Sequence, residues 1–252
     1  MIKRGNHPWR KSRENGGTGL PSPPASVYLL PHSMSHARKK KKITATPIAQ
    51  ATEAFAFLAR FAARPTQVGA LFPSSKELAK AMLEGIELKS GDIVIEFGPG
   101  TGAFTDAVLK RLPEGAKYLG IERDPHFHGH LEDRFPGIDF HHGSAEELPD
   151  LLSRRGWGKP RLILSGLPFA SMPLEVQELI LTATRESLHE EGEFRTFTYP
   201  ICWYMTGSRR FRRLATTHFS QYRKSRTIHR NIPPAKVLSY RKPTKRLKAE
   251  GF

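Results

Sequence analysis

A turn that holds three glycines at alternate positions allows few backbone arrangements for the chain around it. The turn lies in residues 92–105, which have the sequence DIVIEFGPGTGAFT. The apolar run IVI before it has the pattern of a short buried strand, and residues 103–112 after it have the pattern of a helix. Gly98, Gly100 and Gly102 lack side chains, so a ligand can lie against their backbone beside the N–H groups of the helix N-terminus. The segment therefore predicts a strand, a ligand-binding turn and a helix.

Two acidic residues near this turn narrow the kind of ligand. The glycine spacing is GxGxG rather than the GxGxxG that holds a pyrophosphate. Glu96 lies two residues before Gly98, where a carboxylate repels a pyrophosphate but attracts a sulfonium or an α-ammonium group. Glu122 ends a second predicted strand, residues 118–122, and a carboxylate at this point can accept hydrogen bonds from both hydroxyls of a ribose. The pattern indicates a ligand that combines a cationic group with a ribose.

Alternating strand and helix patterns continue beyond this second strand. A third strand and its turn are predicted within residues 138–145, and a fourth strand within residues 161–169 ends in a Gly-Pro loop. Helical patterns lie between the strands, at residues 103–112, 125–134 and 145–155. This alternation predicts an open, mainly parallel α/β sheet, which binds its ligands at the carboxyl ends of the strands.

The charge of the chain is concentrated at its two ends. The net charge of the 252 residues is +16, with +9 in residues 1–46, −6 in residues 47–207 and +13 in residues 208–252. Residues 1–46 also lack a hydrophobic period, so we expect a disordered basic extension, a folded domain over residues 47–243 and a basic tail over residues 244–252. Basic ends of this kind indicate a polyanionic partner, which is either a membrane surface or RNA.

Composition and residue spacing exclude several classes of protein. The single cysteine, Cys202, leaves no disulfide framework and no Cys-rich zinc site. His126, His128 and His130 lie two apart near a predicted helix start and do not converge on one face, so no metal site is predicted. The sequence has no apolar run of transmembrane length, and we expect a cytoplasmic protein.

Residues 48–63 have the pattern of an amphipathic helix. Its broad apolar face carries Phe55, Phe57, Leu58 and Phe61, and a run of five consecutive cations precedes it. One interpretation is that this face packs on the core of the domain. The other is an interfacial helix that inserts its aromatic side chains into an anionic membrane, and the neighbouring cations favour it.

The glycine turn and the ends of the second and fourth strands resemble the S-adenosylmethionine-dependent methyltransferases, through the segments EFGPGTGAFT, GIERD and SGLPF. More narrowly, the chain is similar to the bacterial phospholipid N-methyltransferases that methylate phosphatidylethanolamine, and to their relatives acting on ornithine lipids. Residues 57–75, 197–200 and 230–237 extend this similarity with the segments FLARFAARPTQVGALFPSS, FTYP and RNIPPAKV. The resemblance covers roughly residues 50–242. It implies a Rossmann-like, seven-stranded, mostly parallel sheet and S-adenosyl-L-methionine as the cofactor.

The resemblance also implies which residues contact the cofactor. They follow the first four strands and are Glu96, Gly98, Gly100, Gly102, Glu122, Ser144, Ala145 and Ser165. Glu96 and the first two glycines would hold the methionine end, Glu122 the ribose, and Ser165 the point where donor and acceptor meet. Ser144 and Ala145 would lie beside the adenine where the family usually has Asp, so backbone groups of residues 143–145 would have to replace a charged acceptor.

The ribosomal RNA adenine dimethylases are the alternative, since their first turn is nearly the same and a net charge of +16 suits an RNA-binding protein. They carry Asn-Leu-Pro-Tyr after the fourth strand, where the Asn carbonyl accepts from the target amine and the Tyr stacks on the base. This chain has Gly166 in place of the Asn and Phe169 in place of the Tyr. An exocyclic base amine needs the side-chain acceptor that glycine lacks, whereas an aliphatic amine does not. The difference favours a lipid amine and argues against a nucleic-acid partner.

The expected reaction is direct in-line transfer of the methyl group from the sulfonium to the amino nitrogen of a membrane lipid, in one or more steps. Tyr199, at the end of the fifth strand, is expected either to pack in the core or to orient the amine and stabilise the growing cation. His229 is a candidate proton acceptor, Arg230 a clamp for phosphate or carboxylate, and Asn231 a cap of the same turn. The expected partners are the aminolipid and the anionic inner face of the cell membrane, with no obligate protein partner.

Overall fold

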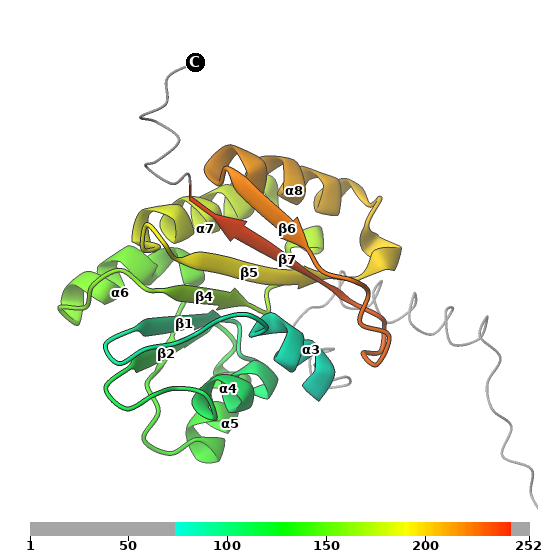
Figure 1. Cartoon of the computed structure of the whole chain (residues 1–252). Helices are drawn as coiled ribbons and strands as arrows, with labels where there is room; N and C mark the ends of the chain where they lie inside the picture. Colours follow the sequence, from blue (N-terminus) through cyan, green and yellow to red (C-terminus); the bar gives the residue numbers. More distant parts are fainter. Residues whose placement is uncertain (1–73, 243–252) are drawn as a thin grey trace, which may run out of the picture. The chain divides into compact units, whose positions relative to one another are not determined.

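The computed structural model describes residues 74–242, which form one seven-stranded sheet with helices on both faces (Figure 1). The order across the sheet is β3-β2-β1-β4-β5-β7-β6. The strands are β1 (Ile93–Phe97), β2 (Lys117–Glu122), β3 (Phe140–His142), β4 (Leu162–Ser165), β5 (Glu193–Thr198), β6 (Gln221–Lys224) and β7 (Lys236–Arg241). Strands β1 to β5 are parallel, whereas β7 is antiparallel to both β5 and β6. The predicted seven-stranded, mostly parallel α/β sheet is confirmed.

Helices cover the two faces of the sheet in separate groups. The longer helices are α3 (Lys76–Met82), α4 (Ala103–Leu109), α5 (Pro125–Arg134), α6 (Leu148–Arg154), α7 (Leu174–Ser187) and α8 (Thr206–His218). The short 3₁₀ helices are η1 (Ala145–Glu147), η2 (Phe169–Ser171) and η3 (Pro200–Cys202). Helices α3 and α4 contribute to the core on one face, and α6, α7 and α8 contribute to the core on the other.

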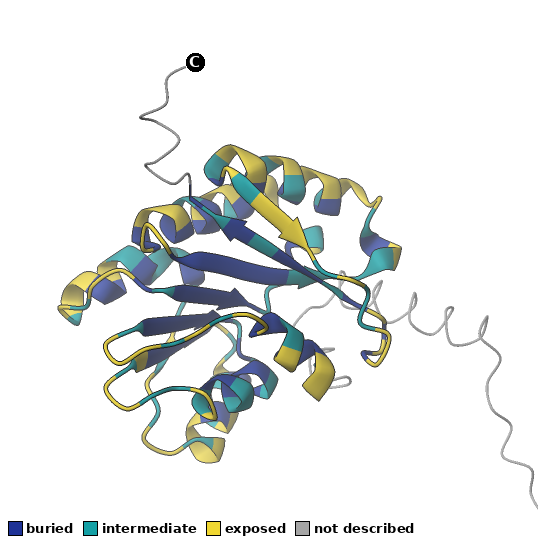
Figure 2. Ribbon diagram, in the orientation of Figure 1, coloured by how far each residue is buried: buried dark blue, intermediate teal, exposed yellow. Residues whose placement is uncertain are grey.

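Strand β1 shows how both faces are filled. Ile93, Ile95 and Phe97 belong to the core under α6, α7 and α8, whereas Val94 belongs to the core under α3 and α4. Successive side chains of a strand point to opposite faces, and a strand that is covered on both faces is apolar at most positions. Figure 2 shows β1 and β4 buried along their length. Glu96 is the exception in β1, because it is a fully buried residue with an ionisable carboxyl group.

Local sequence signals predict the bounds of some helices accurately and those of others less accurately. Helix α5 has the bounds that the pattern predicts, and the Asp124 side chain caps its start by accepting hydrogen bonds from two N–H groups of the first turn. The helix predicted over residues 103–112 ends earlier, at Leu109. The helix predicted over residues 145–155 is divided into η1 and α6.

The register of the central strands aligns their carboxyl ends. Phe97 in β1 is paired with Ile121 in β2 and with Ser165 in β4, and Ser165 is paired with Thr196 in β5. The turns that follow these strands therefore lie along one edge of the sheet. This is the edge at which parallel α/β sheets bind their ligands.

Several predictions concern segments outside the described residues. They are the basic segments 1–46 and 244–252 and the amphipathic helix 48–63 with Phe55, Phe57, Leu58 and Phe61. No helix within residues 74–242 has the length and apolar character needed to span a membrane. Within the same range, no three His, Cys, Asp or Glu side chains lie together as a metal site requires.

Candidate active site

The three glycines of the turn after β1 have different structural roles. All three have positive φ angles, +64° at Gly98, +56° at Gly100 and +80° at Gly102, which favours glycine because other residues are strained there. A Cβ atom at Gly98 would lie 2.8 Å from the Leu167 side chain, and one at Gly102 would lie 2.4 Å from Phe135. At Gly100 such an atom would have no neighbour within 4 Å. Close packing thus requires two of the glycines, while Gly100 borders open space.

Glu122 connects the end of β2 to this turn. One carboxylate oxygen accepts from the N–H of Gly100 at 2.9 Å, and the other accepts from the N–H of Asp124 at 3.0 Å. The side chain is largely buried, so these two bonds hold the carboxylate in a fixed position. Each carboxylate oxygen keeps further acceptor capacity. A pair of hydroxyls beside Gly100 would find two acceptors already oriented.

Glu96 lies under the same turn in a very different environment. Its Oε2 accepts from the hydroxyls of Tyr118 at 2.6 Å and Thr105 at 2.9 Å. Its Oε1 is buried and has no hydrogen-bond partner among the described residues. Burial raises the pKa of this carboxyl to about 7, the two hydroxyl donors lower it, and the negative charge of Glu122 raises it further. A cationic donor would supply the partner that Oε1 lacks, and it would hold the carboxyl in its charged form.

Ser144 and Ala145 follow β3 and form part of a helix cap. The N–H of Ser144 donates to Glu147 at 2.7 Å, and its hydroxyl donates to Glu146. Ala145 is buried in the core under α6. The polar groups of Ser144 are therefore used within the cap of η1. The resemblance to a family that usually has Asp at this point did not predict this role. Their contact with an adenine stays a prediction.

The loop after β4 lies directly on the glycine turn. Ser165 is fully buried, and its hydroxyl accepts from the N–H of Leu167 at 3.2 Å, which shapes the loop. The N–H of Gly166 donates to the carbonyl of Phe97 at 2.8 Å. A Cβ atom at Gly166 would lie only 2.6 Å from the carbonyl oxygen of Gly98. Glycine at position 166 therefore allows a backbone contact, in addition to removing a side-chain acceptor.

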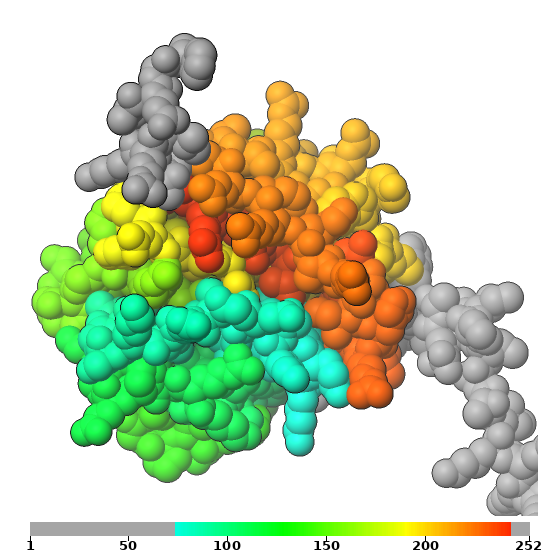
Figure 3. Space-filling model, viewed as in Figure 1, coloured from blue at the N-terminus to red at the C-terminus, as the bar shows by residue number. Residues whose placement is uncertain are grey.

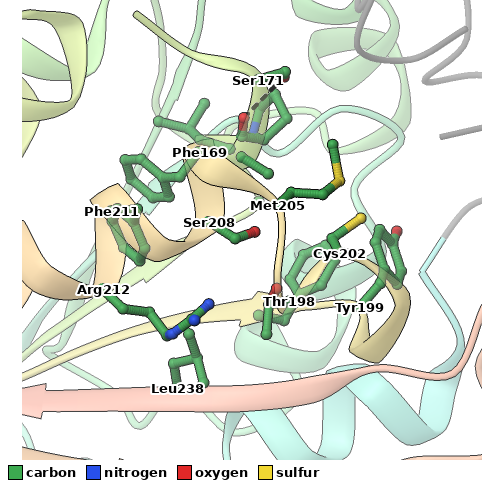
Figure 4. A pocket seen from close by; sticks show the side chains of 15 residues that line it. Phe169, Ser171, Thr198, Tyr199, Cys202, Met205, Ser208, Phe211, Arg212 and Leu238 are labelled. Carbon is green, nitrogen blue, oxygen red and sulfur yellow. Dashed lines mark hydrogen bonds between the residues drawn. The ribbon is translucent and has the colours of Figure 1, made fainter. Parts of the chain in front are cut away.

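A cavity of about 90 Å³ opens on the other side of this loop (Figure 4). Its walls are residues 166–171, residues 197–199 at the end of β5, Leu238 in β7, and side chains of η3 and α8. These walls are mostly apolar, and one lining residue, Arg212, carries a charge. Gly166 and Leu167 contact the glycine turn and also line the cavity. A molecule in the cavity would thus lie next to a ligand bound at the turn.

Tyr199 lines this cavity, as expected of a residue that meets the acceptor, and it also packs edge-on against Phe197. Burial raises the pKa of its hydroxyl to about 12, with a smaller contribution from Cys202. The hydroxyl is therefore protonated at neutral pH. It can donate or accept a hydrogen bond, but it cannot act as the general base, because it still carries its own proton.

The three residues predicted near the end of the chain do not line the cavity. His229 and Arg230 are exposed. Asn231 is buried: its Oδ1 accepts from the N–H of Ser75 at 2.9 Å and its Nδ2 donates to Pro233 at 2.7 Å. It fastens the start of α3 to the loop before β7, and Figure 3 shows these two segments in contact, in cyan and orange. The described part of the chain gives no support to His229 as a proton acceptor.

No sequence motif indicated the side of the cavity that η3 and α8 form. Cys202, Met205, Ser208, Phe211 and Arg212 contribute to it. These residues belong to no motif. Helix α8 nevertheless contains a signal in its sequence. Its apolar side carries the small residue Ser208 and the charged residue Arg212, where a helix that only packs on the core would carry larger apolar residues.

Comparisons with known proteins agree with this geometry. Residues 63–141 match the family model described as ribosomal RNA adenine dimethylase. An ornithine lipid N-methyltransferase from Singulisphaera acidiphila is 30% identical over 184 residues, which are 72% of this chain and 92% of that protein. Ribosomal RNA small subunit methyltransferase A from Chlorobaculum parvum is 29% identical over 133 residues, which are 50% of this chain and 47% of that protein.

Solved structures share the fold at low sequence identity. TrmN from Thermus thermophilus matches with a TM-score of 0.55 and 18% identity, over 71% of this chain and 52% of that chain. A putative rRNA methylase from Clostridium thermocellum matches with a TM-score of 0.52 and 13% identity, over 68% of this chain and 98% of that chain. At such identities the likeness concerns the fold alone.

The fold and the glycine turn between two buried carboxylates define an S-adenosyl-L-methionine-dependent methyltransferase. The chain belongs to the ornithine lipid N-methyltransferase family, which is related to the ribosomal RNA adenine dimethylases. The residues at the turn fit the cofactor. Glu96 has an unsatisfied buried oxygen for its cationic end, Gly100 offers open space, and Glu122 presents oriented acceptors to its ribose.

Proposed function

We propose that this protein transfers methyl groups to the amino head group of a membrane lipid, either ornithine lipid or phosphatidylethanolamine. The observation that carries the proposal is the apolar cavity that shares Gly166 and Leu167 with the cofactor turn. An apolar cavity suits the lipid end of such a substrate and keeps water from the reacting atoms. The name of the Singulisphaera relative supports the same substrate class.

Phe169 supports a lipid amine over a nucleic-acid base. It stands where the dimethylases carry the tyrosine that stacks on the base, yet it is buried and stacked on Phe211, with ring centroids 4.2 Å apart. It also packs edge-on against Phe194. A ring held in this way is not free to receive a base. Together with the glycine at position 166, this arrangement removes both groups that recognise an adenine.

The cofactor supplies a methyl group already activated on a sulfonium, so the protein acts mainly by positioning. Glu96 and Glu122 would hold the two ends of the donor, and the Ser165 loop would set the point of transfer. An apolar cavity lowers the pKa of a bound alkylamine, because desolvation disfavours its charged form, and this exposes the nitrogen lone pair. Tyr199 lines the cavity, so its protonated hydroxyl would orient the neutral amine and its ring would stabilise the cation that forms.

The proposed place of action is the anionic inner face of the cell membrane, to which the protein binds peripherally. The basic ends and the phenylalanine-rich segment 48–63 support it. A further support is the segment beside the cavity, where Tyr204 is 83% exposed, Ile201 43% and Met205 44%. Exposed aromatic and aliphatic side chains next to the opening would let a lipid head group enter while its chains stay in the bilayer.

The experiment is methyl transfer from labelled S-adenosyl-L-methionine to three acceptors in separate reactions: phosphatidylethanolamine vesicles, ornithine lipid vesicles and ribosomal RNA. We expect label in one or both lipids and none in the RNA. The Glu122→Ala variant, run in parallel, shows whether the label depends on this site. Label in the RNA alone would overturn the proposal in favour of the dimethylase alternative.

A further inference from the structure

Arg212 is held rigidly at the wall of the cavity. Its Nη2 donates to the carbonyl of Trp203 at 2.8 Å, and its guanidinium carbon lies 3.8 Å from the centre of the Trp203 ring. A second cation, Lys224, lies 4.6 Å from the centre of the same ring. These contacts fix the orientation of the guanidinium, and the neighbouring lysine adds positive charge.

The charge of Arg212 is not neutralised within the described residues. Arg195 and Arg241 both pair with Glu193, and Arg155 pairs with Asp139. No such carboxylate lies within ion-pair distance of Arg212 in residues 74–242, and its Nη1 is buried without a hydrogen-bond partner there. The guanidinium as a whole is half-buried and Nη2 has an acceptor, but the buried Nη1 has none among these residues. A buried donor without an acceptor is unfavourable, so an anion that accepts from Nη1 is bound favourably.

Two hydroxyl groups lie near this unpaired donor. Ser208 is four residues before Arg212 in α8 and therefore on the same side of the helix, and it is buried. Thr198 is the last residue of β5. Figure 4 shows both hydroxyls and the guanidinium turned toward the interior of the cavity. A guanidinium and two hydroxyl donors in an otherwise apolar wall form a site for a single oxyanion.

We propose that Arg212, with Ser208 and Thr198, binds the oxyanion of the substrate head group. The inference rests on the proposed lipid substrate and adds the way in which it is recognised. Phosphatidylethanolamine carries a phosphodiester near its amine, and ornithine lipid carries a carboxylate. Either oxyanion can pair with the guanidinium while the amine reaches Gly166 and Leu167 at the cofactor side of the same cavity. Arg212 thus selects zwitterionic aminolipids over lipids that carry an amine alone.

The test is the steady-state kinetics of Arg212→Gln with three acceptors in neutral vesicles: phosphatidylethanolamine, ornithine lipid and a long-chain alkylamine without an anion. The matched control is Arg213→Gln, which removes an exposed cation from the same helix. We expect Arg212→Gln to raise KM about tenfold or more for the zwitterionic lipid, because a hydrogen-bonded charge pair is lost. We expect unchanged KM for the alkylamine and unchanged Kd for S-adenosyl-L-methionine.

The results separate the possible sources of the anion. If Arg212→Gln raises KM for phosphatidylethanolamine alone, the anion that Arg212 binds is a phosphodiester. If it raises KM for ornithine lipid alone, the anion is a carboxylate. If KM changes equally for Arg212→Gln and Arg213→Gln, or equally for the alkylamine, the anion site is wrong although lipid methylation stands. If the unmodified protein labels no lipid, the proposed function itself is wrong. Ser208→Ala, which makes a smaller change in α8, should raise KM several-fold in the same pattern and covers the case that Arg212→Gln fails to fold.

Discussion

Glu96 and Glu122 lie on two sides of one glycine turn, yet they are prepared for binding in opposite ways. Glu122 accepts hydrogen bonds from two backbone N–H groups and is oriented before the cofactor arrives. Glu96 is enclosed by the core, with one oxygen satisfied by two hydroxyls and the other by nothing in residues 74–242. The two acids should therefore respond differently to pH and to substitution.

Cofactor binding should weaken as the pH falls below about 7, because Glu96 must lose its proton to pair with a cation and burial raises its pKa to about 7. The expected loss approaches about tenfold in affinity for each pH unit below this value. Calorimetric titration with S-adenosyl-L-methionine between pH 5.5 and 7.5 measures it. Glu96→Gln should bind weakly with little pH dependence, and an equally flat profile for the unmodified protein would contradict the assignment.

The protonation of Glu96 also makes the stability of the cofactor-free protein depend on pH. The pKa of Glu96 in the folded chain lies above the 4.5 of an unfolded chain, so the folded state holds the proton more tightly. Its contribution to the free energy of unfolding is present below pH 4.5 and declines by up to about 3 kcal/mol as the pH rises to about 7. Urea unfolding of the unmodified protein and of Glu96→Gln at several pH values measures how the free energy of unfolding of each depends on pH. If this dependence is the same for the two proteins, Glu96 does not make the predicted contribution.

Glu122→Ala should reduce cofactor affinity about 100-fold, because the ribose and the N–H of Gly100 both lose a charged acceptor. Association with anionic vesicles should remain, since it does not depend on this turn. Calorimetry and vesicle sedimentation measure the two properties. Loss of both would mean that the variant is misfolded, and Glu122→Gln, which keeps the shape of the side chain, then replaces it.

At the scale of elements, the site depends on close backbone contacts between turns. The loop after β4 contacts the glycine turn through Gly166, and α8 approaches η2 so closely that a Cβ atom at Gly207 would lie 1.9 Å from the carbonyl oxygen of Ala170. Such contacts leave no room for a side chain. They connect the cofactor turn to the cavity wall, so a small change in one loop should alter catalysis.

Gly166→Ala should lower kcat/KM about tenfold or more, because its methyl group would lie 2.6 Å from a backbone oxygen and the loop would have to move. The free energy of unfolding should fall by about 1–3 kcal/mol. The matched control is Gly129→Ala in α5, where an added Cβ has no neighbour within 4 Å. That control should be neutral or more stable by about 0.5–1 kcal/mol. Equal behaviour of the two variants in kinetics and urea unfolding would refute the role of the loop contact.

At the scale of the whole molecule, the proposed membrane binding is supported by the net positive charge of the chain and by exposed apolar side chains beside the cavity. The segment from η3 to the start of α8 lines the cavity through Cys202, Met205 and Ser208 and exposes Tyr204 beside it. The net positive charge of the chain favours an anionic surface. The opening of the cavity would therefore lie at the surface that contacts the membrane. A lipid head group would then have only a short distance to move into the cavity.

The double variant Ile201→Ser, Tyr204→Ser should bind anionic vesicles several-fold more weakly, because it removes apolar surface beside the opening. Cofactor affinity should not change. Leu179→Ser is the matched control, since Leu179 is 55% exposed on α7 and does not line the cavity. Vesicle sedimentation at fixed salt compares the three proteins. A loss as large in Leu179→Ser would show that general hydrophobicity, and not this segment, is responsible.

Local sequence patterns predicted several parts of the structure for physical reasons that act over a few residues. Hydrophobic runs between turn residues gave β1, β2 and β4, and the helical pattern of residues 125–134 gave both ends of α5. Alternate glycines gave the positive φ angles of the turn. Helix α4 was predicted too long because its end depends on tertiary packing, which a periodic pattern does not contain.

The amino-acid sequence alone determined the parallel α/β sheet and the acid-flanked glycine turn, because these follow from backbone preferences and side-chain types within short segments. The same residues indicated a cationic, ribose-containing ligand, and the resemblance to a known family implied which cofactor it is. Tertiary structure alone decided that Gly166 contacts Gly98, that Phe169 is stacked in the core, and that Arg212 faces the cavity with no carboxylate from residues 74–242 beside it. These contacts join segments far apart in the chain. Whether a side chain is satisfied, enclosed or free depends on neighbours that only the folded topology brings together.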